Sequence, residues 1–309
     1  MGDKSAIEWT DATWNPIRGC SRVSEGCRNC YAERMAGRQI NGAYKGLVRS
    51  TGGGWTGEVR FVEDALDRPL RWKAPRRIFV NSMSDLFHEK VTESWIAQIF
   101  NVMRSAEQHT FQVLTKRPER MRDLLSRWAA SPGIGNGYGW VTKPLPNVWL
   151  GASVEDQAMA DERIPLLLQT PAAVRWVSSE PALGRVDFHR WLYNTSVLSG
   201  EQTGGASLDW LVVGGESGPG ARPFDLAWAR SAIAQCRAAG VPCFVKQLGA
   251  HPHYEQPSGR MFCGAPQGLW ARQPGCGAPS WSRSLVLRDR KGGDMAEFPE
   301  DLKVREYPR

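Results

Sequence analysis

Three cysteines lie close together near the start of the chain, within the run GCSRVSEGCRNCYAE that extends from residue 19 to residue 33. Cys20, Cys27 and Cys30 are three of the seven cysteines in the sequence. Thiolates are ligands of zinc and of iron–sulfur clusters, and two thiols can also form a disulfide. The odd number of cysteines and the charged N-terminus, which lacks the apolar stretch of a secretion signal, argue against a disulfide framework.

Zinc and an iron–sulfur cluster are the two remaining explanations of these cysteines. A structural zinc site takes four protein ligands, commonly arranged as two CxxC-like pairs. Here Cys27 and Cys30 form such a pair, and Cys20 would need a distant partner. An iron–sulfur cluster with three thiolate ligands would leave one iron open for a chelating co-substrate. The spacing favours the cluster, and zinc stays the alternative. The candidates for a fourth zinc ligand are His88, His109, Cys236, Cys243, Cys263 and Cys276.

A second set of polar residues follows apolar runs that have the character of buried strands. In parallel α/β sheets, ligands bind at the carboxyl ends of the strands. We therefore expect these residues to converge with the cysteines on one rim, although each of them taken singly could be an ordinary cap or ion pair. They are Ser84 and Asp85, Thr115 and Lys116, Ser153 and Glu155, Ser179 and Glu180, Gly215 and Glu216, and Lys246 and Gln247.

The elements that would position these residues follow a repeating rhythm of short strands and amphipathic helices. Apolar residues at helical spacing occupy the run TESWIAQIFNVMRSAEQH (92–109), and they follow the apolar run RIFV (77–80). Pro118 is placed to open a helix, and Gly240 is placed to cap the end of another. Six or seven such units predict an α/β fold with a parallel sheet, either open or closed as a barrel.

Several segments interrupt this rhythm. Residues 41–75, 129–146 and 182–208 are rich in glycine, proline or polar residues, and we expect them to be insertions. A short helix is expected near FHRWLYN (188–194) in the third of them. The part of the chain from about residue 250 onward is rich in Gly, Pro, Trp and His, and it predicts an irregular tail.

The bulk composition limits the class of protein. The chain has 309 residues, 41% of them hydrophobic, and it has no apolar run of the ~20 residues that a membrane span needs. We therefore expect a cytoplasmic protein without a membrane partner. The net charge of +7 favours polyanionic partners, above all nucleic acid, and the fourteen tryptophans include candidates for stacking on bases.

The motifs together resemble a known family. Three close cysteines after the first strand of a βα barrel resemble the radical S-adenosylmethionine (SAM) superfamily, although the spacing here is C-x6-C-x2-C rather than the usual C-x3-C-x2-C, and Asn29 replaces the usual aromatic residue. A closer resemblance is to a phage-associated three-cysteine-motif family of unknown function, related to the spore photoproduct lyase and DNA-repair-photolyase-like branch. It rests on TWNPIRGCSRVSEGCRNCYAERM, SMSDLFHE, LTKRPERM, GASVED, SSEPALG, VVGGESGPGARP, FVKQLG and DRKGGDMAEFPEDLKVREYP.

This resemblance implies a fold and a chemistry. Residues 1–249 would form a partial (βα)6–7 TIM-like barrel of the radical SAM type, and residues 250–309 would form an irregular extension packed on it. Cys20, Cys27 and Cys30 would hold a [4Fe–4S] cluster whose fourth iron chelates SAM. Reduction by an electron donor such as flavodoxin or ferredoxin would then cleave SAM to a 5′-deoxyadenosyl radical, which modifies or repairs a substrate.

The resemblance also implies roles for individual residues of the SAM site. Ser84 and Asp85 would contact the amino group of SAM, and Lys116 would pair with its carboxylate. Ser153 would lie near the ribose, and Glu180 would reach the ribose or the amino group. Gly214 and Gly215 would let the backbone approach the adenosine.

The substrate is expected to be a nucleic acid or a nucleotide. In the spore photoproduct lyase branch, a cysteine at the position of Ser82 donates a hydrogen atom to the product radical. The serine found here argues against a photoproduct lyase, and Cys263 and Cys276 are the alternative donors. There are two competing interpretations. The protein could be a non-catalytic nucleic-acid-binding protein stabilised by a cluster or by zinc, or an enzyme that uses zinc as a Lewis acid. The insertions carry basic and aromatic residues expected near the rim: Lys45, Arg49, Trp55, Trp140, Lys143, Arg185 and Trp191.

Overall fold

The computed structural model of the chain describes residues 5–39, 42–49, 54–130, 143–193, 206–254 and 283–308. Its main feature is a seven-stranded sheet in which every neighbouring pair of strands is parallel. The strands lie in the order β1 (Ala12–Trp14), β4 (Arg77–Val80), β5 (Thr110–Thr115), β6 (Val148–Ser153), β7 (Val174–Ser179), β8 (Trp210–Gly214) and β10 (Cys243–Gln247).

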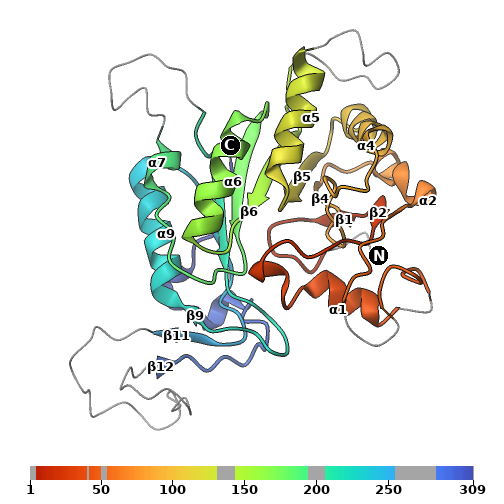
Figure 1. Cartoon of the computed structure of the whole chain (residues 1–309). Helices are drawn as coiled ribbons and strands as arrows, with labels where there is room; N and C mark the ends of the chain where they lie inside the picture. The colour runs from red at the N-terminus through yellow and green to blue at the C-terminus, as the bar shows by residue number, and fades with distance from the viewer. Residues whose placement is uncertain are drawn as a thin grey trace, which may run out of the picture.

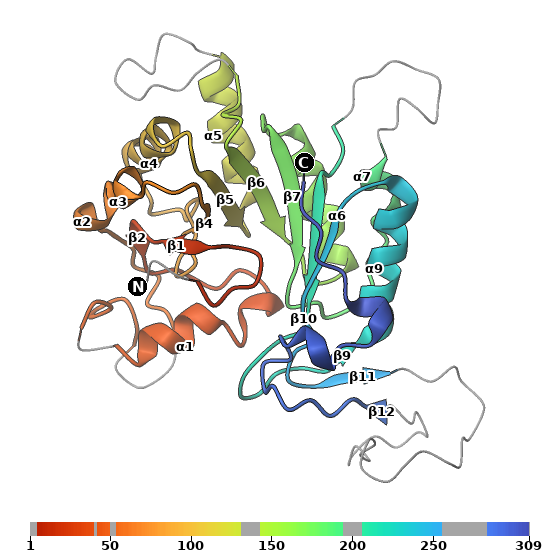
Figure 2. The same cartoon turned by 180° about the vertical axis from the view of Figure 1, so that it is seen from behind.

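Helices follow most of these strands and cover one face of the sheet (Figure 1). The sheet curls so that its other face forms the inside of a half-barrel, as the view from behind shows (Figure 2). This confirms the expected partial TIM-like barrel. The principal helices are α1 (Tyr31–Gly37), α4 (Glu93–Ser105), α5 (Pro118–Ala130), α6 (Gln157–Gln169) and α9 (Leu226–Ala239).

The local signals in the sequence account for several helix boundaries. α5 begins at Pro118, as expected. α9 ends at Gly240, whose φ of 69° is the left-handed conformation that glycine adopts without strain. α4 begins after Thr92, whose side chain accepts a hydrogen bond from the backbone of Trp95.

Short elements occupy the connections. β2 (Ile17–Arg18) pairs with β3 (Arg60–Phe61), and it separates β1 from the cysteine loop, residues 19–30, which contains a 3-10 turn at Glu25–Cys27. α2 (Glu63–Leu66) and α3 (Arg68–Arg71) precede β4, and α7 (His189–Leu192) lies where a short helix was expected. β9 (Phe224–Asp225), β11 (Pro252–Tyr254) and β12 (Arg283–Ser284) form a small separate sheet, and 3-10 turns occur at Met295–Glu297 and Glu300–Leu302.

Two apolar layers hold the half-barrel together. The larger layer lies between the sheet and its helices. The smaller one fills the inner face with Trp9, Trp176, Trp210, Val212 and Phe244. Gly151 leaves the space that the Trp176 ring fills, because an added Cβ would lie 2.5 Å from the indole carbon Cε2. Aromatic rings therefore plug the amino-terminal part of the half-barrel and leave its carboxyl rim to polar groups.

The C-terminal segment runs antiparallel along the free edge of β10. The backbone N–H of Val245 donates to the carbonyl of Val304 at 2.8 Å, and that of Glu306 donates to Cys243 at 2.9 Å. Tyr307 then stacks on Trp210, with ring centroids 5.6 Å apart. This segment covers a sheet edge that would otherwise present unpaired backbone groups. None of the helices in the described part of the chain has the length and apolar character needed to span a membrane.

Candidate functional site

A cavity of about 160 Å³ lies at the carboxyl ends of β4, β5 and β6, beside the cysteine loop. The loop enters from β2 and leaves into α1, and a parallel bridge between Gly19 and Ser84 places its start beside the turn after β4. The three cysteines line this one cavity together with four of the expected SAM contacts, Ser84, Asp85, Lys116 and Ser153. Thr115, Ser82 and Trp55, which the sequence also singled out, line it as well.

The three thiols are free and half-buried. Burial raises the pKa of the Cys20 thiol to about 12, and the nearby Asp85 carboxylate adds to this effect. Burial likewise raises the pKa of Cys30, although N–H groups in the first turn of α1 act in the opposite direction. Cys20 and Cys30 are therefore neutral thiols at pH 7 in the metal-free protein, and a metal would have to displace their protons.

Asp85 is a buried carboxylate with all of its acceptor positions in use. Oδ1 accepts hydrogen bonds from the Thr115 hydroxyl at 2.7 Å and from the Phe87 backbone at 2.9 Å. Oδ2 accepts from the Lys116 backbone and from the Arg117 guanidinium, both at 3.1 Å. A carboxylate offers about four acceptor sites. Asp85 therefore joins the turn after β4 to the end of β5.

Arg117 is a site residue that the sequence did not single out. Besides Asp85 it donates to Glu89 at 2.7 Å and to the hydroxyl of Ser21, next to Cys20, at 2.7 Å. Burial lowers the pKa of Arg117, but Asp85 and Glu89 outweigh burial and raise it above its usual range. Arg117 thus fixes the first part of the cysteine loop to β5.

Glu155 makes a corresponding connection to β6. This carboxylate is 1% exposed and accepts hydrogen bonds from the Ser24 hydroxyl at 2.8 Å and from the buried Arg163 at 3.1 Å. The ammonium of Lys116 lies 3.5 Å from it. Gly26 packs directly against the Glu155 side chain, because an added Cβ would lie 2.5 Å from its Cδ. The middle of the cysteine loop is therefore held by one buried acid.

The loop after β8 holds the last part of the cysteine loop. Glu216 accepts hydrogen bonds from Asn29 at 2.9 Å and from Arg222 at 2.9 Å. Burial acts to raise the pKa of Glu216, but the hydrogen bonds from Arg222 and Asn29 bring that pKa below its ordinary value. Arg34 of α1 donates to the carbonyls of Ser217 and Pro219. Asn29, between Cys27 and Cys30, and Arg222, which donates to the carbonyl of Glu25, therefore join the cysteine loop to the loop after β8.

Three of the residues expected to contact SAM do not line the cavity described above. Glu180 forms an ion pair with Lys246, 2.5 Å between Oε1 and Nζ. Gly215 is required by packing, because an added Cβ would lie 2.5 Å from the carbonyl oxygen of Leu248. At Gly214 the added Cβ would lie 3.2 Å from the carbonyl oxygen of Gln247. The two glycines allow the end of β10 to approach β8.

The candidate zinc partners have other contacts. His88 accepts the backbone N–H of Lys90 at Nδ1, and its Nε2 lies 2.9 Å from the Ser21 hydroxyl, so both ring nitrogens are engaged. His109 contacts the carbonyl of Pro69. Cys236 and Cys243 lie in the core between α9 and β10. Cys263 and Cys276 lie outside the described residues. Within the described ranges, no group of three or more His, Cys, Asp or Glu side chains is arranged around a single metal ion.

The tryptophans expected to stack on bases are not on the surface. Trp191 is 4% exposed and lies in the main core, which corrects the expectation that it lies near the rim. Trp55 is 6% exposed, lines the cysteine cavity and packs against Tyr44. Trp140 lies outside the described residues. The basic residues of the insertions, Lys45, Arg49, Lys143 and Arg185, are exposed.

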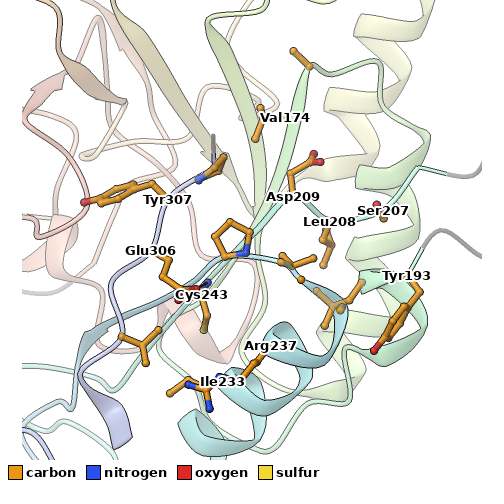
Figure 3. A pocket seen from close by; sticks show the side chains of 18 residues that line it. Val174, Tyr193, Ser207, Leu208, Asp209, Ile233, Arg237, Cys243, Glu306 and Tyr307 are labelled. Atoms are coloured by element: carbon orange, nitrogen blue, oxygen red, sulfur yellow. Dashed lines mark hydrogen bonds between the residues drawn. The ribbon is translucent and has the colours of Figure 1, made fainter. Parts of the chain in front are cut away.

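A second cavity, of about 1080 Å³, lies at the opposite ends of the strands. Figure 3 shows Tyr193, Ser207 and Asp209 on its wall together with Glu306 and Tyr307 of the C-terminal segment. It is larger than the cysteine cavity, and of the candidate metal ligands and strand-end residues its lining contains only Cys243. Its two best-defined carboxylates accept backbone hydrogen bonds, Asp209 from Arg175 and Glu306 from Cys243.

Comparison with known proteins places the chain in a family. A family model described as "Protein of unknown function (DUF5131)" matches residues 4–291, so the chain belongs to this family. None of the curated proteins is similar enough to match. Among solved structures, a cysteine-to-serine mutant of spore photoproduct lyase shares 11% sequence identity with the chain, with a TM-score of 0.38, over 84% of this chain and 71% of that chain. Spore photoproduct lyase complexed with dinucleoside spore photoproduct shares 12% identity, with a TM-score of 0.31, over 64% and 54% of the two chains.

Proposed function

We propose that this member of the DUF5131 family is a radical SAM enzyme in which Cys20, Cys27 and Cys30 hold a [4Fe–4S] cluster. One observation carries the proposal: the three free thiols share a single cavity with Ser84 and Lys116 at the carboxyl rim of a parallel half-barrel. The described lining of this cavity contains neither a histidine nor a fourth cysteine, so the donor set suits a cluster with one open iron.

The chain's own residues would position and shield the reactants. When bound, the cluster would supply the electron that cleaves SAM to methionine and a 5′-deoxyadenosyl radical. The Lys116 ammonium, 19% exposed and 3.5 Å from Glu155, is a cationic partner for the SAM carboxylate. The acceptor sites of Asp85 are filled by its neighbours, so Ser84 remains the better partner for the amino group. Ser153 would lie near the ribose, and Glu180, Gly214 and Gly215 would border the adenosine from the next strands.

A nucleic acid or a nucleotide is the substrate class that the charge of the chain supports best. The net charge is +7, and Arg22 and Arg28 of the cysteine loop have half or more of their side-chain surface exposed. Arginines beside the cavity would contact phosphates. A base inside a duplex could not reach the cavity, so the substrate would be single-stranded or flipped out of its helix.

The cluster is tested by anaerobic reconstitution of the full chain. We expect a brown protein with iron and sulfide in equal amounts, which forms 5′-deoxyadenosine from SAM after reduction. Alanine at Cys20, Cys27 or Cys30 should abolish iron binding, whereas the matched Cys236→Ala variant should retain it. A colourless wild-type protein that binds stoichiometric zinc would refute the proposal and would favour the metal-stapled alternative.

The substrate class is tested separately by binding to single- and double-stranded oligonucleotides at several salt concentrations. Phosphate contacts predict that the logarithm of the affinity falls with the logarithm of salt, with a slope of about −0.9 per contact on duplex. The Arg22→Ala and Arg28→Ala variants should each reduce that slope by about one contact, and Arg127→Ala on α5 serves as the control. Weak binding that does not respond to salt would exclude nucleic acid and would leave the radical chemistry unaffected.

A further inference from the structure

Asn81 is the first residue after β4 and has an unusual backbone. Its φ of 59° lies in the left-handed region, and among the described residues other than glycine it alone has a positive φ. Asparagine tolerates this conformation better than most residues, but conformations of this kind are retained mainly where the surroundings require them. Asn81 is one of the residues that line the cysteine cavity.

The Asn81 side chain has a donor without an acceptor. Its Oδ1 accepts the backbone N–H of Ile17 at 3.3 Å, which fixes the orientation of the amide. Its Nδ2 is buried and has no hydrogen-bond partner, and the residue as a whole is 2% exposed. The neighbouring Asn15 shows the contrast: its Nδ2 donates to Ser82 and its Oδ1 accepts from Met83. A buried donor without an acceptor costs free energy, so its presence in the lining of a cavity indicates a ligand that supplies the acceptor.

The other groups around the cavity indicate the charge of the ligand. The Lys116 ammonium, 19% exposed, lies in the same lining, whereas the Arg117 guanidinium is already paired with Asp85 and Glu89. The lining acid, Asp85, has no acceptor position left for Asn81, because four donors from β5 and from its own turn already occupy its oxygens. The Lys116 ammonium and the Asn81 Nδ2 are therefore the donors that the lining offers to a ligand, which suits an anion.

We propose that Asn81 is a ligand-binding residue whose Nδ2 donates a hydrogen bond to an anionic acceptor of the molecule that occupies the cavity. This inference rests on the proposed function, which offers two sources of the acceptor: a sulfide of the cluster or the carboxylate of SAM. A hydrogen bond to a sulfide would stabilise the more negative, reduced cluster and raise its reduction potential. A hydrogen bond to the carboxylate would strengthen SAM binding. It would not change the reduction potential that the cluster has in the absence of SAM.

The decisive variant is Asn81→Asp, compared with Asn81→Gly. Aspartate keeps an oxygen for the Ile17 N–H and replaces the donor by a negative charge, whereas glycine removes the side chain and keeps the left-handed backbone. Asn147→Asp is the matched control, since the Asn147 amide donates to Met103 and His109 away from the cavity. Thermal unfolding establishes that each variant is folded before it is compared.

Two measurements on reconstituted protein separate the sources: the midpoint potential without SAM, and the dissociation constant of SAM by equilibrium dialysis. A lower potential in both Asn81 variants identifies the sulfide. A SAM affinity about tenfold to hundredfold weaker at an unchanged potential identifies the carboxylate. Suppose that the wild-type protein takes up the cluster and binds SAM, and that both Asn81 variants have the same midpoint potential and the same SAM affinity as wild type. This result would refute the role of Asn81 and leave the proposed function standing. A wild type without cluster or SAM binding refutes the proposed function, and the inference with it.

Discussion

Replacing Gly26 by alanine should displace the cysteine loop from β6. An added Cβ would overlap the Glu155 side chain, with Cδ at 2.5 Å. Glu155 cannot move freely, because it is 1% exposed and is held by Ser24 at 2.8 Å and by Arg163 at 3.1 Å. Gly26 does not have a positive φ, so the effect of the methyl group is steric rather than conformational.

The loss of stability depends on which contacts of Glu155 change. Overpacking a buried position costs about 1–3 kcal/mol. If Glu155 shifts, its hydrogen bond from Ser24 is lost as well, and hydrogen bonds to charged groups are worth about 1.5–3 kcal/mol. We therefore expect the free energy of unfolding to fall by about 2.5–6 kcal/mol. At roughly 2–4 °C per kcal/mol, the melting temperature should fall by about 5 °C or more.

Gly37→Ala is the matched control on the same segment. Gly37 is the last residue of α1, and an added Cβ there would meet nothing within 4 Å. Alanine at this position should be neutral or stabilise the protein by up to about 1 kcal/mol. Urea denaturation of both metal-free variants measures the difference, and iron retention after reconstitution reports on the loop. A Gly26→Ala protein as stable as Gly37→Ala would show that the loop is not packed against Glu155.

Three further predictions concern the contacts of the site. Arg117→Ala should lower the free energy of unfolding by about 3–5 kcal/mol, because it leaves the buried Asp85 without its cation. Arg127→Ala, which removes the exposed ion pair with Glu93, is the control, and equal losses of the two variants in urea denaturation would contradict the structural role of Arg117. Lys116→Ala should weaken SAM binding about tenfold to hundredfold in equilibrium dialysis, and unchanged affinity would remove this lysine from the SAM site. Because the pKa of Glu216 is lowered in the folded protein, its contribution to stability should be complete above pH 4.5 and be lost as pH falls through the folded pKa. Glu216→Gln should therefore flatten the dependence of the unfolding free energy on pH below 4.5. The same dependence in wild type and variant would refute this role of Glu216.

The sequence predicted the architecture because its signals are local. Apolar runs and helical spacing indicated a parallel sheet, Pro118 and Gly240 marked helix ends, and all three were confirmed. The expectation that strand-end residues meet the cysteines also needs no knowledge of side-chain partners. It follows from parallel strands alone, since their carboxyl ends share one edge.

The partners of the charged residues could not be predicted in the same way. Glu155 and Glu216 were visible as strand-end acids, but nothing local shows that they hold Ser24 and Asn29, which lie more than a hundred residues earlier in the chain. Trp55 is another example, because a tryptophan in a glycine-rich segment is compatible with a surface or with a core. Burial was decided by tertiary packing beside the cysteine loop.

The position of Tyr307 has a consequence for how the protein is made. The last strand of the sheet ends at Gln247, but the aromatic interior and the edge of β10 are complete only when residues up to Tyr307 are present. At roughly 5–20 residues per second, a ribosome needs about 3–12 s to add this remaining stretch. During that time the nascent half-barrel exposes an unpaired strand and part of its tryptophan-lined interior. Chaperone binding to stalled chains that end shortly after β10 should therefore exceed binding to chains that extend past Tyr307.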